Sequence, residues 1–186
     1  MGFYDEEESV NQYIEMVRDY DNRFIINFAE KFIPSGSRLL EIGIGPGKDM
    51  DSLQKKYDVT GSDYSPVFLD KYRKKNPQSD LLLLNAETLE TNLTFDALFS
   101  NKVLHHLSPD QLVKSFKAQN RILNPGGVLF HTFWYGQGVE EIMGLFFHYY
   151  SEENLKRMIG DQYEILNISR YQEEEEDDSI VLVLKK

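Results

Sequence analysis

The chain has 186 residues, of which 41% are hydrophobic and 27% are charged, so it is long enough to bury the core of one globular domain. Its 20 Lys and Arg residues against 31 Asp and Glu residues give a formal net charge of -11, which repels the phosphate backbone of nucleic acids and anionic membrane surfaces. The absence of cysteine excludes disulfides, thiolate nucleophiles and thiolate metal sites. The first residues are acidic where a secretory signal is basic, and no apolar run approaches the roughly 18 residues of a membrane span. We therefore expect a cytoplasmic protein with neither nucleic acid nor membrane among its partners.

The chain is predicted to open with a long amphipathic helix. Apolar residues recur at helical spacing from Ser9 to Phe32, and Ser9 with Gln12 has the form of a capping box. The pattern falters at residues 19–22, where a kink and a break into two helices both remain open. Pro34 then ends the helical pattern.

Short apolar runs alternate with helical patterns after this opening segment. Strands are expected at residues 38–42, 58–63, 80–84, 95–100 and 128–134, and helical patterns run through 50–57, 66–75 and 109–123. Ser65 and Ser108 each precede a proline and are predicted to cap the helix that follows. The four leucines at 81–84 and the apolar run at 95–100 are typical of central parallel strands covered on both faces. This alternation predicts a parallel sheet with helices on both faces.

The patterns are weaker beyond the fifth strand. Residues 139–150 have helical spacing and enough apolar side chains for either a lid or a dimer contact, and both remain open. Ser151 is predicted to cap the next helix, and strands are expected near 163–168 and 180–184, close enough in sequence to form a hairpin. The six consecutive acids of residues 173–178 are expected to form a solvated turn between those two strands.

Three alternating glycines stand between the first expected strand and the next helix. At Gly43, Gly45 and Gly47 the backbone can take turns closed to other residues and can approach a ligand closely, beyond the strand ends where open parallel sheets bind ligands. The spacing is not the dinucleotide fingerprint G-x-G-x-x-G, because the third glycine comes one residue early and Lys48 stands where that fingerprint has Gly or Ala. Asp63 ends the second strand, where a carboxylate can accept hydrogen bonds from two ribose hydroxyls. The glycine spacing therefore disfavours a nicotinamide cofactor, while Asp63 suits any cofactor that carries a ribose.

At these motifs the chain resembles the class I S-adenosylmethionine-dependent methyltransferases of the small-molecule type, and the resemblance covers nearly its whole length. The segments that carry it are Leu39-Leu-Glu-Ile-Gly-Ile-Gly-Pro-Gly-Lys48, Gly61-Ser-Asp-Tyr-Ser65, Asn85-Ala-Glu-Thr-Leu89, Phe95-Asp-Ala-Leu-Phe-Ser-Asn-Lys-Val-Leu-His-His-Leu107 and Leu123-Asn-Pro-Gly-Gly-Val-Leu-Phe130. The resemblance implies an α/β fold: a Rossmann-like, doubly wound sheet of seven strands, mostly parallel with an antiparallel C-terminal strand, and helices on both faces. It also implies one domain over 1–186, with an N-terminal helical lid at 1–35, a cofactor-binding core at 36–134, and C-terminal helices and a strand hairpin at 135–186.

The resemblance implies S-adenosylmethionine as the cofactor and assigns its parts to this sequence. Glu41 and the glycine loop would hold the methionine part, and Asp63 the ribose hydroxyls. Tyr64 would cover one face of the adenine, whose edge would meet Asn85 or the Ala86 backbone. Relatives often have Asp at the position of Asn85, whose amide can both donate and accept hydrogen bonds. The full implied cofactor-binding set, with Glu87 the weaker candidate at the adenine, is Glu41, Gly43, Ile44, Gly45, Gly47, Asp63, Tyr64, Asn85, Ala86, Glu87 and Asn101.

Methyl transfer from a sulfonium is an in-line displacement, for which positioning and exclusion of water supply most of the rate. No large insertion follows the fifth strand to dock a macromolecule, so a small-molecule acceptor is expected. His106, just after the fourth strand, is the preferred base or acceptor-orienting group and the candidate catalytic residue, with packing of the loop as the alternative. Tyr13 and Trp134 join His106 as candidate substrate-binding residues, because an aromatic ring stabilises a cationic amine by about 0.5 to 2 kcal/mol. Core packing is the alternative for both rings.

Two other functions remain open. A nicotinamide-dependent oxidoreductase is disfavoured by the glycine spacing and by the lack of a Tyr-x-x-x-Lys sequence. A non-catalytic regulatory protein that binds S-adenosylmethionine would keep the same motifs. His131 and His148 are expected to be structural, and no close spacing of ligand types indicates a metal site. The sequence leaves the methylated atom and the oligomeric state open.

Overall fold

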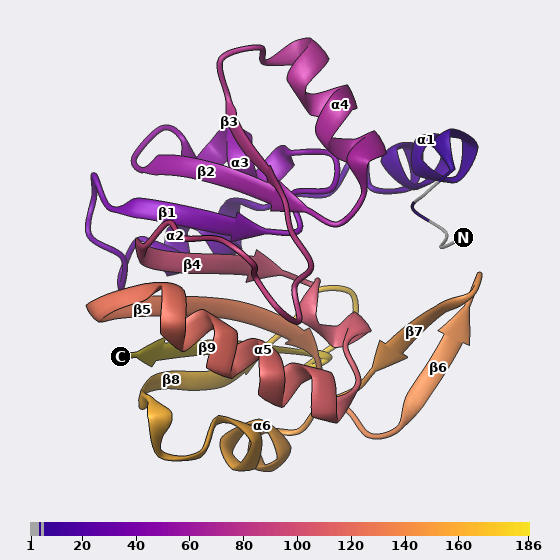
Figure 1. The fold of residues 1–186 in the computed structure, drawn as a ribbon. Helices are drawn as coiled ribbons and strands as arrows, with labels where there is room; N and C mark the ends of the chain where they lie inside the picture. Colours follow the sequence, from indigo (N-terminus) through magenta and orange to yellow (C-terminus); the bar gives the residue numbers. More distant parts are fainter. Residues whose placement is uncertain (1–3, 5) are drawn as a thin grey trace.

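Seven strands form one sheet in the order β3-β2-β1-β4-β5-β9-β8 in the computed structural model, which describes Tyr4 and residues 6–186 (Figure 1). The strands of this sheet are β1 (Arg38–Ile42), β2 (Asp58–Asp63), β3 (Asp80–Leu83), β4 (Phe95–Asn101), β5 (Leu123–Trp134), β8 (Glu164–Tyr171) and β9 (Ser179–Lys185). Strands β1 to β5 pair in parallel, and β9 lies antiparallel between β5 and β8. The mostly parallel sheet with its antiparallel C-terminal strand confirms the fold class expected from the sequence.

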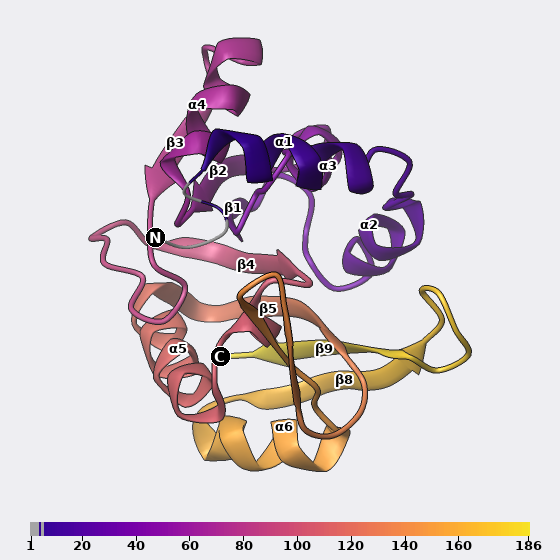
Figure 2. The same ribbon diagram turned by 90° about the vertical axis from the view of Figure 1, so that its right-hand side faces the viewer.

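Helices cover both faces of this sheet (Figure 1). They are α1 (Glu7–Met16), α2 (Arg23–Ala29), α3 (Lys48–Leu53), α4 (Pro66–Lys75), α5 (Pro109–Ile122) and α6 (Glu152–Ile159), with short 3-10 turns η2 (Leu104–His106) and η3 (Gly160–Gln162). Buried side chains of α2, α3 and α4 pack against one face, and those of α5 and α6 pack against the other. The remaining helix, α1, lies against α4 (Figure 2).

The centre of the sheet is apolar because β1 and β4 are covered on both faces. Leu39 pairs with Ala97 and Leu40 with Leu98, and all four are fully buried. Burying a leucine in this way stabilises the fold by about 1.5 to 3 kcal/mol. The central placement expected for the four-leucine run is wrong, because β3 is an edge strand beside β2 and leaves Leu83 61% exposed. A leucine run has the same local pattern in either place, and only pairing with distant segments decides between them.

Serine caps begin three of the helices, as the sequence predicts. The Oγ atom of Ser65 accepts a hydrogen bond from the backbone N–H of Phe68 at the start of α4. Ser108 and Ser151 form capping boxes at α5 and α6. The capping box expected at Ser9 is wrong, because α1 begins before it and has Glu6 at its N-cap without a side-chain hydrogen bond.

The opening helical segment is broken into two helices, α1 and α2. Of the two alternatives that the sequence left open, the break is therefore correct and the kink is not. The Nζ atom of Lys48 donates to the backbone carbonyls of Arg18 and Tyr20 in this break. Asn22 donates to the carbonyl of Lys48 at 3.0 Å. Carbonyls at the end of a helix need partners outside it, and here the start of α3 supplies them. The break therefore ties the N-terminal helices to the segment that follows the glycine loop.

The helix expected at residues 139–150 is wrong, because this segment is a two-stranded hairpin of β6 (Val139–Ile142) and β7 (Leu145–His148). The two residues between the strands, Met143 and Gly144, both have positive φ, of 54° and 76°. Such a two-residue turn matches the right-handed twist of paired strands and cannot continue a helix. The hairpin projects from the end of β5 (Figures 1 and 2).

Candidate active site

The glycine loop leaves β1 at the point where the strand order reverses, between β2 and β4. Gly43, Gly45 and Gly47 all have positive φ, of 76°, 48° and 87°. A Cβ atom on Gly47 would lie 2.1 Å from the ring of Tyr72, and one on Gly43 would lie 2.6 Å from Val103. At Gly45 the nearest atom is Cε1 of Tyr13 at 3.9 Å. The loop is thus packed tightly at both ends and more open in its middle.

Asp63 joins this loop to the end of β2. Its Oδ2 atom accepts a hydrogen bond from the backbone N–H of Gly45 at 2.9 Å, and its Oδ1 atom accepts one from Ser65 at 2.8 Å. Burial raises the pKa of the Asp63 carboxyl, while these backbone donors act in the opposite direction. Next to it, Tyr64 is 68% exposed. The structure brings Asp63 and the glycine loop together, as the cofactor-binding prediction requires.

Glu41 places a second carboxyl at the end of β1, two residues before the loop. Its side chain is only 2% exposed, and its Oε2 atom has no hydrogen-bond partner among the residues that the structure describes. Burial raises the pKa of Glu41 well above its usual value, and the nearby Asp49 and Asp63 carboxyls raise it further. A buried, unpartnered carboxyl is unfavourable on its own. A cationic ligand group here would satisfy it, which fits the ammonium of a methionine moiety.

Asn101, at the end of β4, is part of a hydrogen-bond network that the sequence did not reveal. Its Nδ2 atom donates to Oδ2 of Asp49 and to the hydroxyl of Tyr20, both at 2.9 Å. Thr132 donates to Oδ1 of Asn101 at 2.6 Å, and Asn22 donates to Oδ1 of Asp49 at 2.9 Å. Burial raises the pKa of Asp49. Asp49 lies in the first turn of α3, where an acid also stabilises the helix by itself. Its position in the sequence therefore does not identify it as a site residue.

Two other predicted residues border the loop in different ways. Tyr13 lies over Gly45 and packs against Tyr4 and Phe68, with ring centroids 5.4 Å and 5.9 Å away. Burial raises the pKa of Tyr13 to about 12. Ile44 instead faces the core, where its Cγ2 atom would lie 2.9 Å from a Cβ atom on Gly61. Tyr13 therefore lies beside the predicted cofactor-binding loop, whereas Ile44 contributes its backbone to the loop and its side chain to the core.

The predicted adenine turn follows β3. Oδ1 of Asn85 accepts a hydrogen bond from the backbone N–H of Glu87 at 2.7 Å, which shapes the turn. The Glu87 carboxylate accepts hydrogen bonds from Lys114 at 2.8 Å and Gln111 at 2.9 Å, both on α5. Those bonds lower the pKa of Glu87. Ala86 presents its carbonyl to Ser115 at 2.6 Å. The Glu87 carboxylate is thus bound to α5, and among the described residues no hydrogen bond uses the Asn85 amide nitrogen.

A buried chain of hydrogen bonds supports this turn from behind. Ser100 bonds to Nδ1 of His131 at 2.8 Å, and Nε2 of His131 bonds to Oε1 of Gln119 at 2.7 Å. Gln119 then donates to Ser115 at 3.0 Å. Because an amide oxygen only accepts, Nε2 carries the proton of the ring. Burial lowers the pKa of His131 to about 3, so this histidine is neutral and structural, as expected.

His106 lies in η2, beyond the end of β4. Its Nδ1 atom is 2.9 Å from the backbone carbonyl of Phe146. A carbonyl only accepts, so Nδ1 carries the proton and Nε2 is the accepting nitrogen of the neutral ring. Burial lowers the pKa of His106. The rings of Phe147 and Tyr4 have centroids 4.8 Å and 6.2 Å away. His106 is therefore held by β7 and faces the aromatic group that includes the N-terminal Tyr4.

Neighbouring histidines differ from His106 in their surroundings. His105 stacks on Phe147 at 5.2 Å, and neither of its ring nitrogens has a hydrogen-bond partner in the described part of the chain. Burial lowers its pKa well below the usual value. The ring of His148 lies 6.4 Å from that of Tyr150. Among Tyr4 and residues 6–186, no three His, Asp or Glu side chains are grouped so that they could hold a metal ion.

Trp134, predicted to bind a cationic substrate, already contacts a cation of the chain. The Nζ atom of Lys102 lies 3.1 Å from the centroid of the Trp134 ring and 5.7 Å from that of Tyr171. It also donates to Ser179 at 2.6 Å and pairs with Glu173 at 3.3 Å. We call these five residues the Lys102 cage. The sequence predicts that Glu173 lies in a solvated turn, and it contains no signal for a role of Lys102. No local pattern indicates that β4 and the acidic tract meet.

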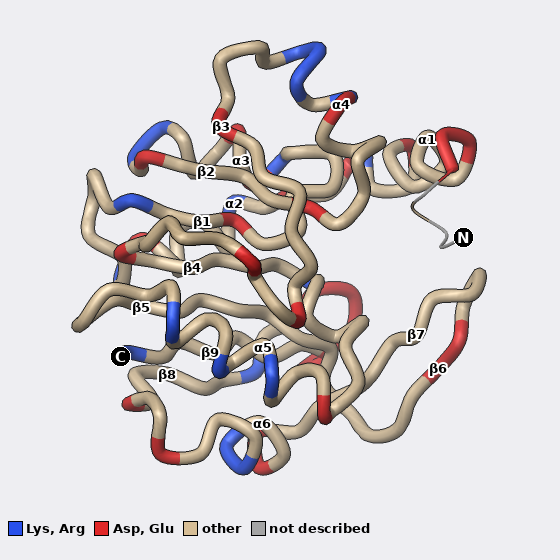
Figure 3. Tube along the Cα trace, viewed as in Figure 1, with Lys and Arg blue, Asp and Glu red and all other residues tan. Residues whose placement is uncertain are grey.

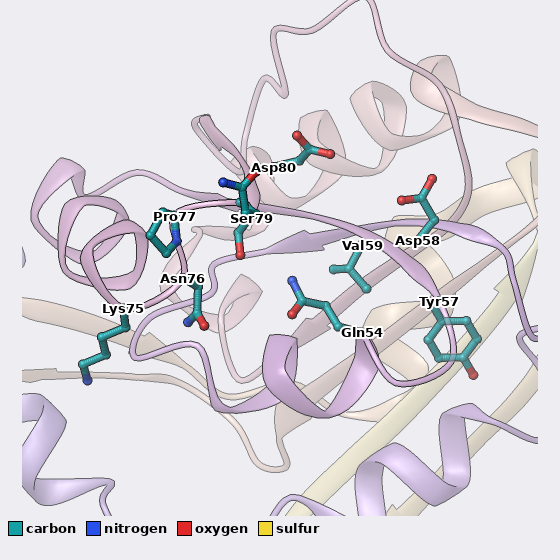
Figure 4. Close-up of a pocket in the computed structure, with 10 residues that line it drawn as sticks. Gln54, Tyr57, Asp58, Val59, Lys75, Asn76, Pro77, Ser79 and Asp80 are labelled. Atoms are coloured by element: carbon teal, nitrogen blue, oxygen red, sulfur yellow. The ribbon is translucent and has the colours of Figure 1, made fainter.

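A separate groove of about 520 Å³ lies at the opposite ends of β2 and β3 (Figure 4). Asp58 and Asp80, which begin these strands, line it together with Gln54, Tyr57, Val59, Lys75, Asn76, Pro77, Gln78 and Ser79. Parallel sheets bind ligands at the other ends of their strands, where Asp63 and Glu41 lie. None of the predicted site residues lines this groove.

Comparison with known proteins agrees with this arrangement. Residues 39–127 match the family described as methyltransferase domain. The chain is similar to 1,6-didemethyltoxoflavin-N1-methyltransferase of Burkholderia thailandensis, solved with 1,6-didemethyltoxoflavin and S-adenosylhomocysteine, with a TM-score of 0.80 at 16% identity over 96% of this chain and 84% of that chain. It is also similar to an S-adenosylmethionine-dependent methyltransferase of Clostridium acetobutylicum, with a TM-score of 0.74 at 16% identity over 96% of this chain and 97% of that chain.

A third similar structure is the N-methyltransferase NodS of Bradyrhizobium japonicum in complex with S-adenosylhomocysteine, with a TM-score of 0.69 at 16% identity over 95% of this chain and 97% of that chain. The sequence match spans the first motif through the turn into β5, and the structural matches span nearly the whole chain. Residues 39–127 therefore match the methyltransferase-domain family, and the chain as a whole shares the fold of S-adenosylmethionine-dependent methyltransferases.

Proposed function

We propose that this protein transfers the methyl group of S-adenosylmethionine to a small-molecule acceptor. The observation that carries the proposal is the Oε2 atom of Glu41, which is buried without a partner at the end of β1. Leaving such a group unsatisfied costs about 1 to 3 kcal/mol. The ammonium of a methionine moiety would remove this cost, so the residues present fit the cofactor.

The proposed cofactor site combines three parts of the chain. Glu41 and the glycine loop hold the methionine part, with Asn101 behind them, and Asp63 binds the ribose. Tyr64, Asn85 and Ala86 bind the adenine. When bound, S-adenosylmethionine supplies an electrophilic methyl group, whose bond to sulfur breaks with the electron pair left on sulfur as the acceptor lone pair forms the new bond. The chain's own residues then orient the acceptor and exclude water.

His106 is the proposed base or acceptor-orienting group. Its Nδ1 proton is held by the Phe146 carbonyl, so Nε2 can accept a hydrogen bond from an acceptor N–H or O–H. Burial keeps the ring neutral by lowering its pKa. Tyr13 and Trp134 are the proposed aromatic contacts of the acceptor. We also propose a single domain over 1–186, with a helical lid at 1–35, of which residues 1–3 and 5 lie outside the described residues, a cofactor-binding core at 36–134, and C-terminal helices and a strand hairpin at 135–186.

The small-molecule acceptor is supported by two of the structural neighbours. The structures from Burkholderia thailandensis and Bradyrhizobium japonicum are N-methyltransferases by name, and this chain covers 84% and 97% of them. In the described part of the chain, every helix is too short or too polar to cross a membrane. We propose a cytoplasmic location because the chain lacks cysteine, which suits a reducing compartment.

Calorimetry with S-adenosylmethionine, S-adenosylhomocysteine and NADH tests this proposal. We expect heat and a thermal upshift with the first two and neither with NADH. The opposite result would support an oxidoreductase and end the proposal. Binding without methyl transfer to a panel of amines, phenols and carboxylates would favour a non-catalytic regulatory protein, which the sequence also allows.

A further inference from the structure

The Lys102 cage brings the acidic loop at residues 172–178 to the ends of β4 and β5. Lys102 directly follows β4 and has a positive φ of 53°. Trp134 ends β5, and Glu173 comes from the acidic tract, coloured red beyond β8 and β9 in Figure 3. Although four of the six acids of this tract are exposed, Glu173 is only 16% exposed at its side chain. The solvated turn expected from the sequence is therefore only part of its role.

The position of the Glu173 carboxylate is fixed from two sides. The Tyr171 hydroxyl donates to its Oε2 atom at 2.7 Å, and Lys102 pairs with the same oxygen at 3.3 Å. The Asp178 carboxylate accepts hydrogen bonds from the backbone N–H groups of residues 173–175, each at 2.9 Å, and so holds the loop. None of the hydrogen bonds recorded for the described residues uses Oε1 of Glu173. One oxygen is thus committed to the protein and the other is available.

The cage already binds an alkylammonium group. The Nζ atom of Lys102 contacts an aromatic face, a hydroxyl and a carboxylate. These are the groups that recognise cationic amines in proteins. Burial lowers the pKa of Lys102 to about 8, while Glu173 acts against this shift. The contacts of Lys102 therefore show that this part of the site accommodates a cationic amine.

The charges that face this end of the sheet are mostly negative. Burial is the main cause that raises the pKa values of Tyr13, Tyr20 and Asp49, and the charge of Glu173 raises them further, so this charge acts on the residues that border the glycine loop. The acids of the region are Glu41, Asp49, Asp63 and Glu173, and the cations are Lys48 and Lys102. Bound S-adenosylmethionine adds a sulfonium and an ammonium against one carboxylate. Since the cofactor ammonium would stabilise Glu41 in its ionised form, the acids remain in excess, and a site of this sign attracts cations and repels anions.

We propose that the acceptor is a small-molecule amine that binds as its cation, with Oε1 of Glu173 as its partner and Lys102 as the positioning residue that holds Glu173. This inference rests on the proposed function and adds the chemical class of the acceptor. An ammonium has no lone pair, so the bound amine gives one proton to water or to His106 before its nitrogen takes the methyl group. Glu173 is thereby a specificity-determining residue supplied by the acidic loop.

Trp134 is the only tryptophan of the chain, and its fluorescence therefore reports on the cage. The test titrates the complex with S-adenosylhomocysteine at pH 7 with three probes of similar shape: phenethylamine, 2-phenylethanol and phenylacetate. We expect a saturable change with phenethylamine at a Kd at least 10-fold lower than that of the other two. Glu173→Gln should remove this preference, and Glu173→Asp should restore part of it. Glu174→Gln is the matched control, because Glu174 is exposed in the same loop.

The outcomes separate the two proposals. Calorimetry with S-adenosylhomocysteine, carried out first on each variant, judges the proposed function, and a thermal melt confirms that each variant folds. If the cofactor product binds but the three probes have equal affinity, or phenylacetate binds most tightly, the inference is wrong. It is equally wrong if phenethylamine gives no saturable change, or if Glu173→Gln and Glu174→Gln behave alike. If the cofactor product does not bind, the same titration of the free protein judges the amine preference alone.

Discussion

Oδ2 of Asp63 accepts a hydrogen bond from the backbone N–H of Gly45 at 2.9 Å, and this bond connects the end of β2 to the middle of the glycine loop. The same carboxylate is the proposed ligand of the ribose hydroxyls. One side chain therefore shapes the loop and meets the cofactor. The strength of cofactor binding should depend on both roles, since a carboxylate that is already fixed loses little freedom when the ligand arrives.

Asp63→Asn should weaken binding of S-adenosylhomocysteine by at least about 10-fold, or 1.4 kcal/mol, because the amide keeps the shape but offers only one accepting oxygen. Calorimetry measures the change. Asp58→Asn is the control, since Asp58 is exposed at the other end of the same strand. Equal affinities of the two variants would contradict the assignment of Asp63.

Gly47→Ala should lower the free energy of unfolding by about 2 to 5 kcal/mol. The φ of Gly47 is 87°, and the added Cβ atom would lie 2.1 Å from the Tyr72 ring. The unfavourable φ costs about 1 to 2 kcal/mol and the overpacking about 1 to 3 kcal/mol. Gly126→Ala is the matched control, because its φ is 77° with no atom within 4 Å of the added Cβ. Urea unfolding should show a loss of only about 1 to 2 kcal/mol there, and equal losses would refute the steric argument.

Glu41→Gln should stabilise the cofactor-free protein above pH 5 and weaken its binding of S-adenosylmethionine. The pKa of Glu41 is raised by burial, so the folded state keeps a proton that the unfolded chain has lost. This contribution to stability is complete below the unfolded pKa and disappears as the pH rises toward the folded pKa. Thermal melts from pH 5 to 8 should therefore fall less steeply for the variant. Asp49 and Asp63, whose pKa values are also raised, would leave a residual slope.

An unchanged slope, or cofactor affinity equal to that of the native protein, would show that Glu41 is not the unsatisfied group the structure indicates. Glu140→Gln serves as the control for a carboxyl lost elsewhere, because Glu140 is exposed on β6. This comparison separates the effect of burial from that of the net charge.

His106→Gln should lower kcat by about 100-fold or more, the range for loss of a general base, while the affinity for S-adenosylhomocysteine stays the same. In the native protein, kcat should fall as the pH drops below the usual histidine range, because the pKa of His106 is lowered and protonation removes the acceptor at Nε2. His148→Gln is the control, as His148 lies two residues beyond Phe146 on β7. A native pH profile retained by His106→Gln would assign the loop a packing role instead.

The fold was largely predictable because its signals are local. Ser65 and Ser108 are N-cap residues that indicate where α4 and α5 begin, and the glycines after β1 indicate the ligand-binding end of the sheet. The helix predicted for residues 139–150 is wrong because the pattern of a short apolar segment fits both a helix and a hairpin until the geometry of its turn is known. The site was only partly predictable, since Glu173 and Lys102 are 71 positions apart and meet only through the packing of β9 beside β5.

The position of β9 also determines when this sheet can be completed. Residues 179–185 lie between β5 and β8, and all but the last of them are buried. While the chain is being synthesised, β5 has an open edge until residues 179–185 emerge, and an apolar open edge can pair with other chains. The nascent protein therefore remains vulnerable to aggregation at this edge until β9 has been synthesised and has paired with β5.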